Sequence, residues 1–77
     1  MLALLDLSRL PAGRALRVRR VAAGLSQREI AERAGLLPAD VSYLERDQRA
    51  ITRDAPVRLN QALAEVEAAR AAPGAAA

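Results

Sequence analysis

Glycines and helix-capping residues divide the middle of this chain into short segments, and the spacing of these residues constrains the fold more than any other feature. Gly24 and Gly35 each follow an amphipathic stretch, at the position where helices commonly end in the left-handed conformation. Ser26 comes soon after the first glycine, and Glu29 follows it at the spacing of a capping box. The pattern therefore predicts a short helix over Gln27–Ala34, bounded by tight turns.

One helix is predicted before this segment and another after it. The earlier helix should follow Pro11–Gly13, which is expected to break the chain, and should end at Gly24. Pro38 suits the first turn of the later helix, because its missing N–H has no intrahelical partner there. We expect that helix to stop near residue 46.

The last part of the sequence indicates a loop and a fourth helix. Residues 48–53 are polar and basic around Ile51, which we expect to be buried. Thr52 or Asp54 should cap the helix that follows, because either side chain can accept from the N–H groups of the first turn. The apolar stripe of this helix is Leu59, Leu63 and Val66.

The composition favours an all-α fold, because Ala and Leu dominate and Tyr43 is the only aromatic residue. A length of 77 residues corresponds to one domain. We expect a compact bundle of four to five helices. Its predicted parts are a Leu-rich N-terminal extension over 1–13, the helical domain over 14–70 and a disordered Ala-rich tail over 71–77.

Charge and missing residue types restrict the function. A net charge of +3 and a pI near 11.0 suit a nucleic-acid partner. The chain has no His and no Cys, so we expect no metal site, no cofactor and no enzymatic activity. No apolar run approaches the ~20 residues of a membrane span. The Leu-rich start lacks the basic region of a signal peptide, and we expect a cytoplasmic, nucleoid-associated protein.

Residues 25–36 and 41–45 together resemble the lambda-repressor/Cro-like (XRE-type) helix-turn-helix family. The shared features are a Ser-Gln start to the second helix, Ala31 at its fifth position, the turn at Gly35, and an apolar-Ser-x-apolar-Glu pattern in the third helix. The resemblance covers about residues 16–63. It implies a lambda-repressor-like bundle in which residues 27–46 form the DNA-binding motif.

The resemblance implies DNA contacts from both helices of the motif and from the loop behind them. Gln27 would hold a phosphate oxygen, or else be a solvated first-turn residue. Tyr43 stands where the family often has a base-contacting side chain; the alternative is a ring packed on the helix surface. Arg49 and Arg53 suit phosphate or minor-groove contacts, with an ordinary basic loop as the alternative. The full predicted set is Gln27, Arg28, Pro38, Ala39, Asp40, Ser42, Tyr43, Arg46, Arg49 and Arg53.

The predicted recognition helix departs from the family at its start, where polar side chains are usual and residues 37–40 are Leu-Pro-Ala-Asp. Pro38 and Ala39 offer no hydrogen bond to a base edge, although either could contact a thymine methyl. Asp40 can accept from a cytosine amine or simply favour the helix N-terminus. We therefore expect shape readout and phosphate contacts to supply much of the specificity.

Two sets of charged residues have a further expected role. The resemblance implies an ion pair between Arg20 and Glu45 that orients the third helix against the first. Arg14, Arg17 and Arg19 form a basic patch on the first helix. This patch would flank a DNA backbone or be an ordinary charged outer face.

These features predict a transcriptional regulator, most simply a repressor that binds a short double-stranded operator as a homodimer. The candidate dimer interface is Leu59, Leu63 and Val66. The N-terminal leucines either add to it or close the monomer core; they are Leu2, Leu4, Leu5, Leu7 and Leu10. The alternative is an antitoxin or phage-type module that binds a second protein on the same fold. The weak, acidic start of the recognition helix and the stretch over residues 51–63 favour this alternative.

Overall fold

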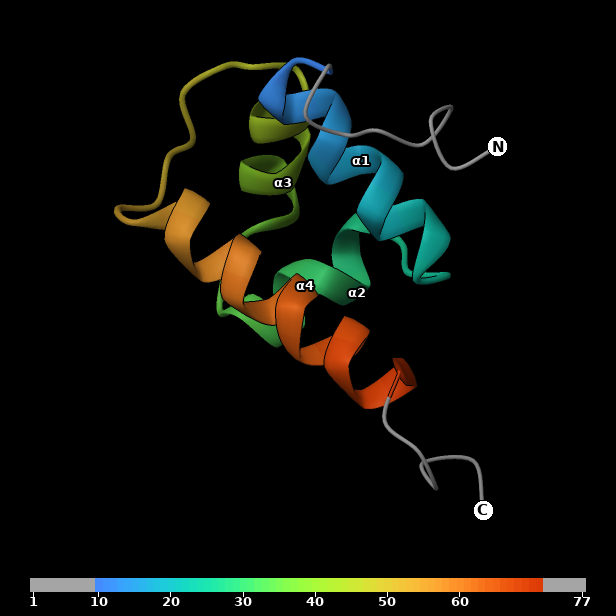
Figure 1. Cartoon of the computed structure of the whole chain (residues 1–77). Helices are drawn as coiled ribbons and strands as arrows, with labels where there is room; N and C mark the ends of the chain where they lie inside the picture. Colours follow the sequence, from blue (N-terminus) through green and yellow to red (C-terminus); the bar gives the residue numbers. More distant parts are fainter. Residues whose placement is uncertain (1–9, 72–77) are drawn as a thin grey trace.

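Four α-helices account for most of the part of the chain that the computed structural model describes, residues 10–71 (Figure 1). They are α1 (Ala12–Ala22), α2 (Gln27–Ala34), α3 (Pro38–Glu45) and α4 (Ala55–Ala71). No β-strand forms within this range, which confirms the all-α prediction with four helices. Nor does any helix within it have the length and apolar character to span a membrane. Most of the expected N-terminal extension and of the Ala-rich tail, residues 1–9 and 72–77, lies outside the described residues.

The hydrophobic core lies where the four helices meet. α2 packs against α3 and α4, and α1 packs against the same two helices. In Figure 1 the long α4 helix runs diagonally past α2. The buried aliphatic cluster draws on every helix and on the turn between α2 and α3, and its members are Leu16, Ile30, Ala31, Leu36, Val41, Ala55, Leu59, Ala62 and Leu63. Each large member contributes about 1.5–3 kcal/mol by leaving water.

The α2 helix has the predicted bounds. Ser26 Oγ accepts the Glu29 N–H at 3.0 Å, and Glu29 Oε1 accepts the Ser26 N–H at 2.9 Å, which completes the capping box. Gly24 and Gly35 have φ angles of +73° and +69°, the left-handed conformation that glycine adopts without strain. Local chemistry therefore defines both ends of this helix.

The start of α1 differs from the prediction. Pro11–Gly13 was expected to break the chain, yet Gly13 lies inside the helix. It faces the last turn of α3, where a Cβ on Gly13 would be 2.5 Å from the Leu44 carbonyl oxygen and 2.7 Å from that of Glu45. The Gly13 N–H donates to Asp47 Oδ1 at 2.8 Å, so a side chain from beyond α3 caps α1. Glycine is needed here for close approach, not for a turn.

The connection between α3 and α4, residues 46–54, also differs from the prediction. Ile51 is not buried but 65% exposed. Polar contacts hold the loop instead: the Gln48 N–H donates to the Tyr43 carbonyl at 2.8 Å, and the Ile51 N–H donates to Asp40 Oδ1 at 2.8 Å. The loop is therefore anchored by hydrogen bonds of its backbone and not by burial of the Ile51 side chain.

The apolar stripe of α4 is buried inside the single chain. The exposed fractions of Leu59, Leu63 and Val66 are 1%, 0% and 7%. The prediction that these three residues form a homodimer interface is wrong, because helix packing within the monomer leaves no surface there for a second chain. Of the N-terminal leucines, only Leu10 falls within the described residues, and it is half-buried.

We expect Gly13→Ala to destabilise the fold, although the same change in most helix interiors stabilises it by about 0.5–1 kcal/mol. The added methyl would lie 2.5–2.8 Å from backbone atoms of α3, so α1 must shift at a cost of about 1–3 kcal/mol. Urea denaturation followed by circular dichroism measures the free energy of unfolding. A variant as stable as the parent chain, or more so, would contradict the close approach of the two helices.

Candidate nucleic-acid interface

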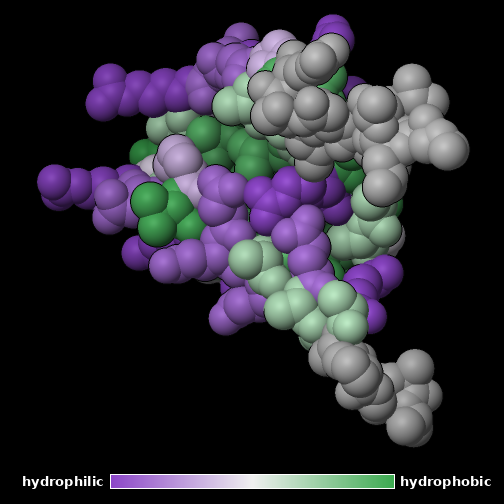
Figure 2. All heavy atoms as spheres, in the orientation of Figure 1, coloured by the Kyte–Doolittle hydropathy of each residue, from purple (hydrophilic) through white to green (hydrophobic). Residues whose placement is uncertain are grey.

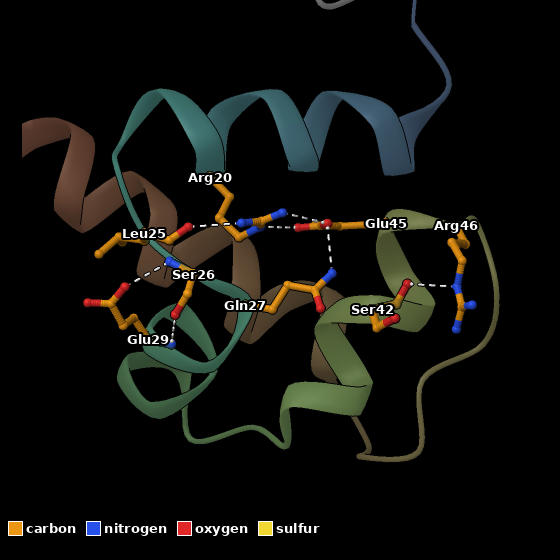
Figure 3. Close-up of polar contacts among 8 residues, drawn as sticks. All are labelled: Arg20, Leu25, Ser26, Gln27, Glu29, Ser42, Glu45 and Arg46. Atoms are coloured by element: carbon orange, nitrogen blue, oxygen red, sulfur yellow. Dashed lines mark hydrogen bonds and ion pairs between the residues drawn. The ribbon is translucent and has the colours of Figure 1, made fainter.

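A buried ion pair joins α1 to α3. Arg20 Nε lies 2.6 Å from Glu45 Oε2, and Arg20 Nη2 lies 3.1 Å from Glu45 Oε1 (Figure 3). The two side chains are only 12% and 5% exposed. Arg20 Nη1 also donates to the Leu25 carbonyl at 2.9 Å, in the turn that leads to α2. The structure thus contains the pair that the family resemblance implied, and it adds a contact to the backbone of the turn.

Gln27 extends this pair to α2. Its Nε2 donates to Glu45 Oε1 at 3.1 Å, so Glu45 accepts from side chains of both α1 and α2 (Figure 3). The bond from the Ser26 backbone N–H lowers the pKa of the Glu29 carboxylate at the same helix start. The amide of Gln27 thus has a structural partner that neither sequence alternative foresaw. Of the backbone N–H groups in the first turn, that of Glu29 is bonded to Ser26 Oγ, while those of Gln27 and Arg28 have no intrahelical acceptor.

The outward face of α3 runs from Ala39 through Ser42 and Tyr43 to Arg46, at the i, i+3, i+4 and i+7 spacing of one helix face. The guanidinium of Arg46 lies over the Tyr43 ring, 5.5 Å from its centroid, and Arg46 Nε donates to the Ser42 carbonyl at 3.3 Å. Val41 lies on the opposite side, fully buried. The four outward residues were all predicted to contact DNA, and the structure brings them onto one surface.

A hollow of about 230 Å³ lies between this face and the two preceding helices. Its lining residues come from α1, α2, α3 and the residue directly after α3, and they are Arg17, Arg20, Gln27, Ser42, Glu45 and Arg46. Because Arg20 neutralises Glu45, the charge that remains at the rim is that of Arg17 and Arg46. The hollow therefore presents positive charge beside the outward face of α3.

Of the two roles predicted for Asp40, the structure supports the one at the N-terminus of the helix. Its side chain is fully buried and accepts from the Leu37 N–H at 3.0 Å, from the Ile51 N–H at 2.8 Å and from the Thr52 N–H at 2.9 Å. The Thr52 hydroxyl also donates to it. The prediction of a base contact by Asp40 is wrong, because no part of its carboxylate faces solvent. The three-residue spacing to Leu37, half of a capping box, was the available sequence signal.

Burial and hydrogen bonding act in opposite directions on this carboxylate. Burial raises the pKa of Asp40, while the bonds from Thr52, Leu37 and Ile51 lower it, and the net pKa lies below the ordinary value of 3.8. The ionised form is therefore the one that the fold stabilises. Asp40 links the start of α3 to the loop that carries Arg49 and Arg53.

Arg49 and Arg53 are exposed on that loop. They line a hollow of about 790 Å³ together with Asp47 and Asp54, so this region carries both signs of charge. Figure 2 shows long hydrophilic side chains projecting on the side of the molecule where the loop lies. Anchored at Asp40 and at the Tyr43 carbonyl, the loop holds its arginines in a defined place relative to α3.

Arg19 does not contribute an unpaired charge to the basic patch of α1. Its Nε and Nη2 lie 2.9 and 2.8 Å from the Glu67 carboxylate, and its Nη1 donates to Asn60 Oδ1 at 2.9 Å. The hydrogen bonds between the two side chains raise the pKa of Arg19 and lower that of Glu67. Arg19 therefore ties α1 to α4, while Arg14 and Arg17 are exposed.

The remaining predicted residues lie around this surface. Arg28 is exposed in the first turn of α2, and Pro38 is exposed at the start of α3. Across residues 10–71, no three acidic, His or Cys side chains gather in a way that could hold a metal ion. The chemistry available at this surface is that of guanidinium groups, backbone N–H groups, one hydroxyl and one phenol.

A family model described as a helix-turn-helix domain matches residues 11–73 of the chain. The matched range includes all four helices and every residue of the hollow between α1, α2 and α3. This match agrees with the resemblance of residues 25–45 to the helix-turn-helix family. Searches of curated proteins and of solved structures gave no significant match.

We expect Glu45→Ala to destabilise the fold by about 3 kcal/mol, because it leaves the buried Arg20 charge without its partner. In a domain of this size that loss lowers the melting temperature by at least about 10 °C. Thermal unfolding followed by circular dichroism measures the shift. Glu32→Ala, which removes an exposed acid from α2, is the matched control and should change the melting temperature little. A shift no larger than that of the control would contradict the structural role of the pair.

We expect the stability of the chain to fall in acid, and Asp40 to account for part of the fall. Its folded-state pKa lies below 3.8, so its contribution is complete above that pH and is lost as the pH drops through the folded-state pKa. Asp40→Asn should cost about 2 kcal/mol at pH 7, since its NH₂ cannot accept the backbone N–H groups. The difference from the parent chain should shrink in acid.

Urea denaturation over a pH series tests this expectation. Asp54→Asn is the matched control, because Asp54 is exposed and its φ of +59° suits Asn equally well. A difference for Asp40→Asn that stays constant from pH 7 into acid would contradict the role of the ionised carboxylate.

Proposed function

Because this chain belongs to the helix-turn-helix domain family, we propose that it is a sequence-specific, DNA-binding transcriptional regulator of the cytoplasm, acting on the nucleoid. The observation that carries the proposal is the outward face of α3 beside the basic hollow that Arg17 and Arg46 border. That combination offers a surface for base edges together with charge for the phosphate backbone. An enzymatic role has no support from the chemistry of this surface.

In the proposed complex α3 lies in the major groove and the neighbouring elements hold the backbone. Arg17 and the N–H groups at the start of α2 would contact phosphates on one side of the groove. Arg28 is exposed in the same first turn. Arg49 and Arg53 would contact the backbone from the loop behind α3. The ion pair and the Gln27 amide keep these elements in one arrangement, so little ordering is needed on binding.

We extend the proposal to a repressor that binds a short operator as a homodimer. One α3 helix reaches a single half-site, and two-fold pairing brings a second α3 helix within reach one helical turn away. The interface must use exposed residues, because the stripe of α4 is buried. Apart from Leu37 at the start of α3, which would face the DNA, the large exposed aliphatic side chains of the described range are Val18, Val21, Ile51 and Val57.

Binding to a second protein, as in antitoxins built on this fold, is the other candidate function. The exposed aliphatic side chains of Ile51 and Val57 favour it, because such groups suit the centre of a protein interface. The two candidates differ in their response to DNA. A chain that binds no duplex even at low salt, yet captures a protein, would support the second candidate.

We expect the chain to bind a fluorescent duplex of random sequence, with an affinity that falls steeply with salt. Arg17→Ala, Arg46→Ala and Arg49→Ala should each reduce the slope of log K against log salt by about 0.9, because each removes one phosphate contact. Fluorescence anisotropy from about 50 to about 200 mM salt measures the slope.

Arg33→Ala is the matched control for these variants. Arg33 lines a different hollow, formed with residues of α4, and its replacement should leave the slope unchanged. Tyr43→Ala should instead alter the preference for particular bases in a selection from random duplexes. Equal slopes for all four arginine variants would contradict the proposed binding surface.

We expect two chains per selected operator, because each monomer presents one α3 helix. Sedimentation of the complex measures the stoichiometry, and a reporter gene placed behind the operator measures repression. One chain per operator would contradict the homodimer. Transcription that rises on expression of the chain would contradict the repressor assignment.

A further inference from the structure

The first turn of α3 presents an apolar surface, which we call the apolar tip and define as Leu37, Pro38 and Ala39. All three residues are exposed, and Leu37 retains 50% of its surface. The one polar side chain of this turn, Asp40, is fully buried and occupied by hydrogen bonds from Leu37, Ile51 and Thr52. The tip therefore has no side-chain donor or acceptor to direct outward.

The apolar tip is continuous with the basic end of the same helix face. Ala39 is followed at helical spacing by Ser42 and then by Arg46. Arg46 and Arg17 border the hollow beside this face. The positive charge at the other end of this face complements a polyanion, which favours nucleic acid over an apolar protein partner as the occupant of the face.

The chemistry of base edges restricts what such a tip can recognise. In the major groove all four bases present hydrogen-bonding groups, and thymine adds to its O4 acceptor a C5-methyl group, the one methyl group on any base edge there. An aliphatic side chain pressed against a donor or acceptor removes its water and returns no partner, which weakens binding. Against a thymine methyl, the same side chain buries apolar surface on both sides.

We propose that the apolar tip reads thymine 5-methyl groups, with Leu37 as the main specificity-determining residue. This inference rests on the proposed DNA-binding function and deepens it. At the start of α3, base specificity then comes from apolar contact. At the middle of the helix it comes from Ser42 and Tyr43. A half-site bound by this chain should carry thymine at the positions that face Leu37 and its two neighbours.

Replacement of thymidine by deoxyuridine tests the proposal, because it removes only the 5-methyl group of the base and keeps every hydrogen-bonding atom. Operators are first selected from a random duplex library with the full chain. Each thymine of the selected half-site is then replaced in turn. We expect the dissociation constant of the parent chain to rise about fourfold at one or more positions, as for one buried methyl group.

Two variants assign this effect to the tip. For Leu37→Ala, the dissociation constants for the duplexes with thymine and with uracil at that position should be nearly equal, so that their ratio is close to one. Val57→Ala, which truncates an aliphatic side chain of similar exposure on α4, should keep the fourfold ratio. Circular dichroism checks that both variants remain folded. The comparison of thymine and uracil operators with the parent chain needs no variant, so it tests the proposal even if Leu37→Ala does not fold.

The outcomes separate this inference from the function on which it rests. If the chain binds the selected operators tightly but with the same dissociation constant for thymine and uracil at every position, the apolar readout is overturned and DNA binding is left intact. A fourfold ratio that survives in Leu37→Ala would overturn the assignment to Leu37. Failure to bind any duplex at low salt would overturn the proposed function, and the readout with it.

Discussion

The carboxylate of Glu45 is the group on which the rest of the structure depends. It is buried at the end of α3, where it accepts from Arg20 of α1 and from Gln27 of α2. A buried carboxylate without partners would be strongly destabilising, so the three helices are stable together only in the arrangement that supplies them. The same arrangement places the start of α2 beside the outward face of α3. Stability and the geometry of the candidate interface therefore rest on one set of bonds.

A second buried carboxylate, Asp40, lies near the other end of α3 and is stabilised differently. Glu45 has a cationic partner, whereas the partners of Asp40 are backbone N–H groups and the hydroxyl of Thr52, near the positive end of the helix dipole. Both acids of α3 thus point inward. The outward face keeps a guanidinium and no carboxylate, which is the charge pattern that a polyanionic partner requires.

Several elements of the fold could be predicted from local chemistry. The bounds of α2 follow from Ser26, Glu29 and Gly35, because a capping box and a left-handed glycine act within a few residues of chain. The outward face of α3 follows from helical periodicity. The role of Gly13 could not be predicted, because its partners are carbonyl groups of α3 about thirty residues away, and a glycine after a proline resembles a break when only its neighbours are considered.

By itself the sequence determined the all-α class, the position of the helix-turn-helix and the residue types offered to a partner, since these depend on periodicity, capping and composition. Only the tertiary structure decided which polar side chains are available to that partner. It buried Asp40 under the loop, paired Arg19 with Glu67 and left Ile51 exposed. Apart from the bond between Asp40 and Leu37, these outcomes depend on contacts between separate segments of the chain, and such contacts have no signature in the local pattern.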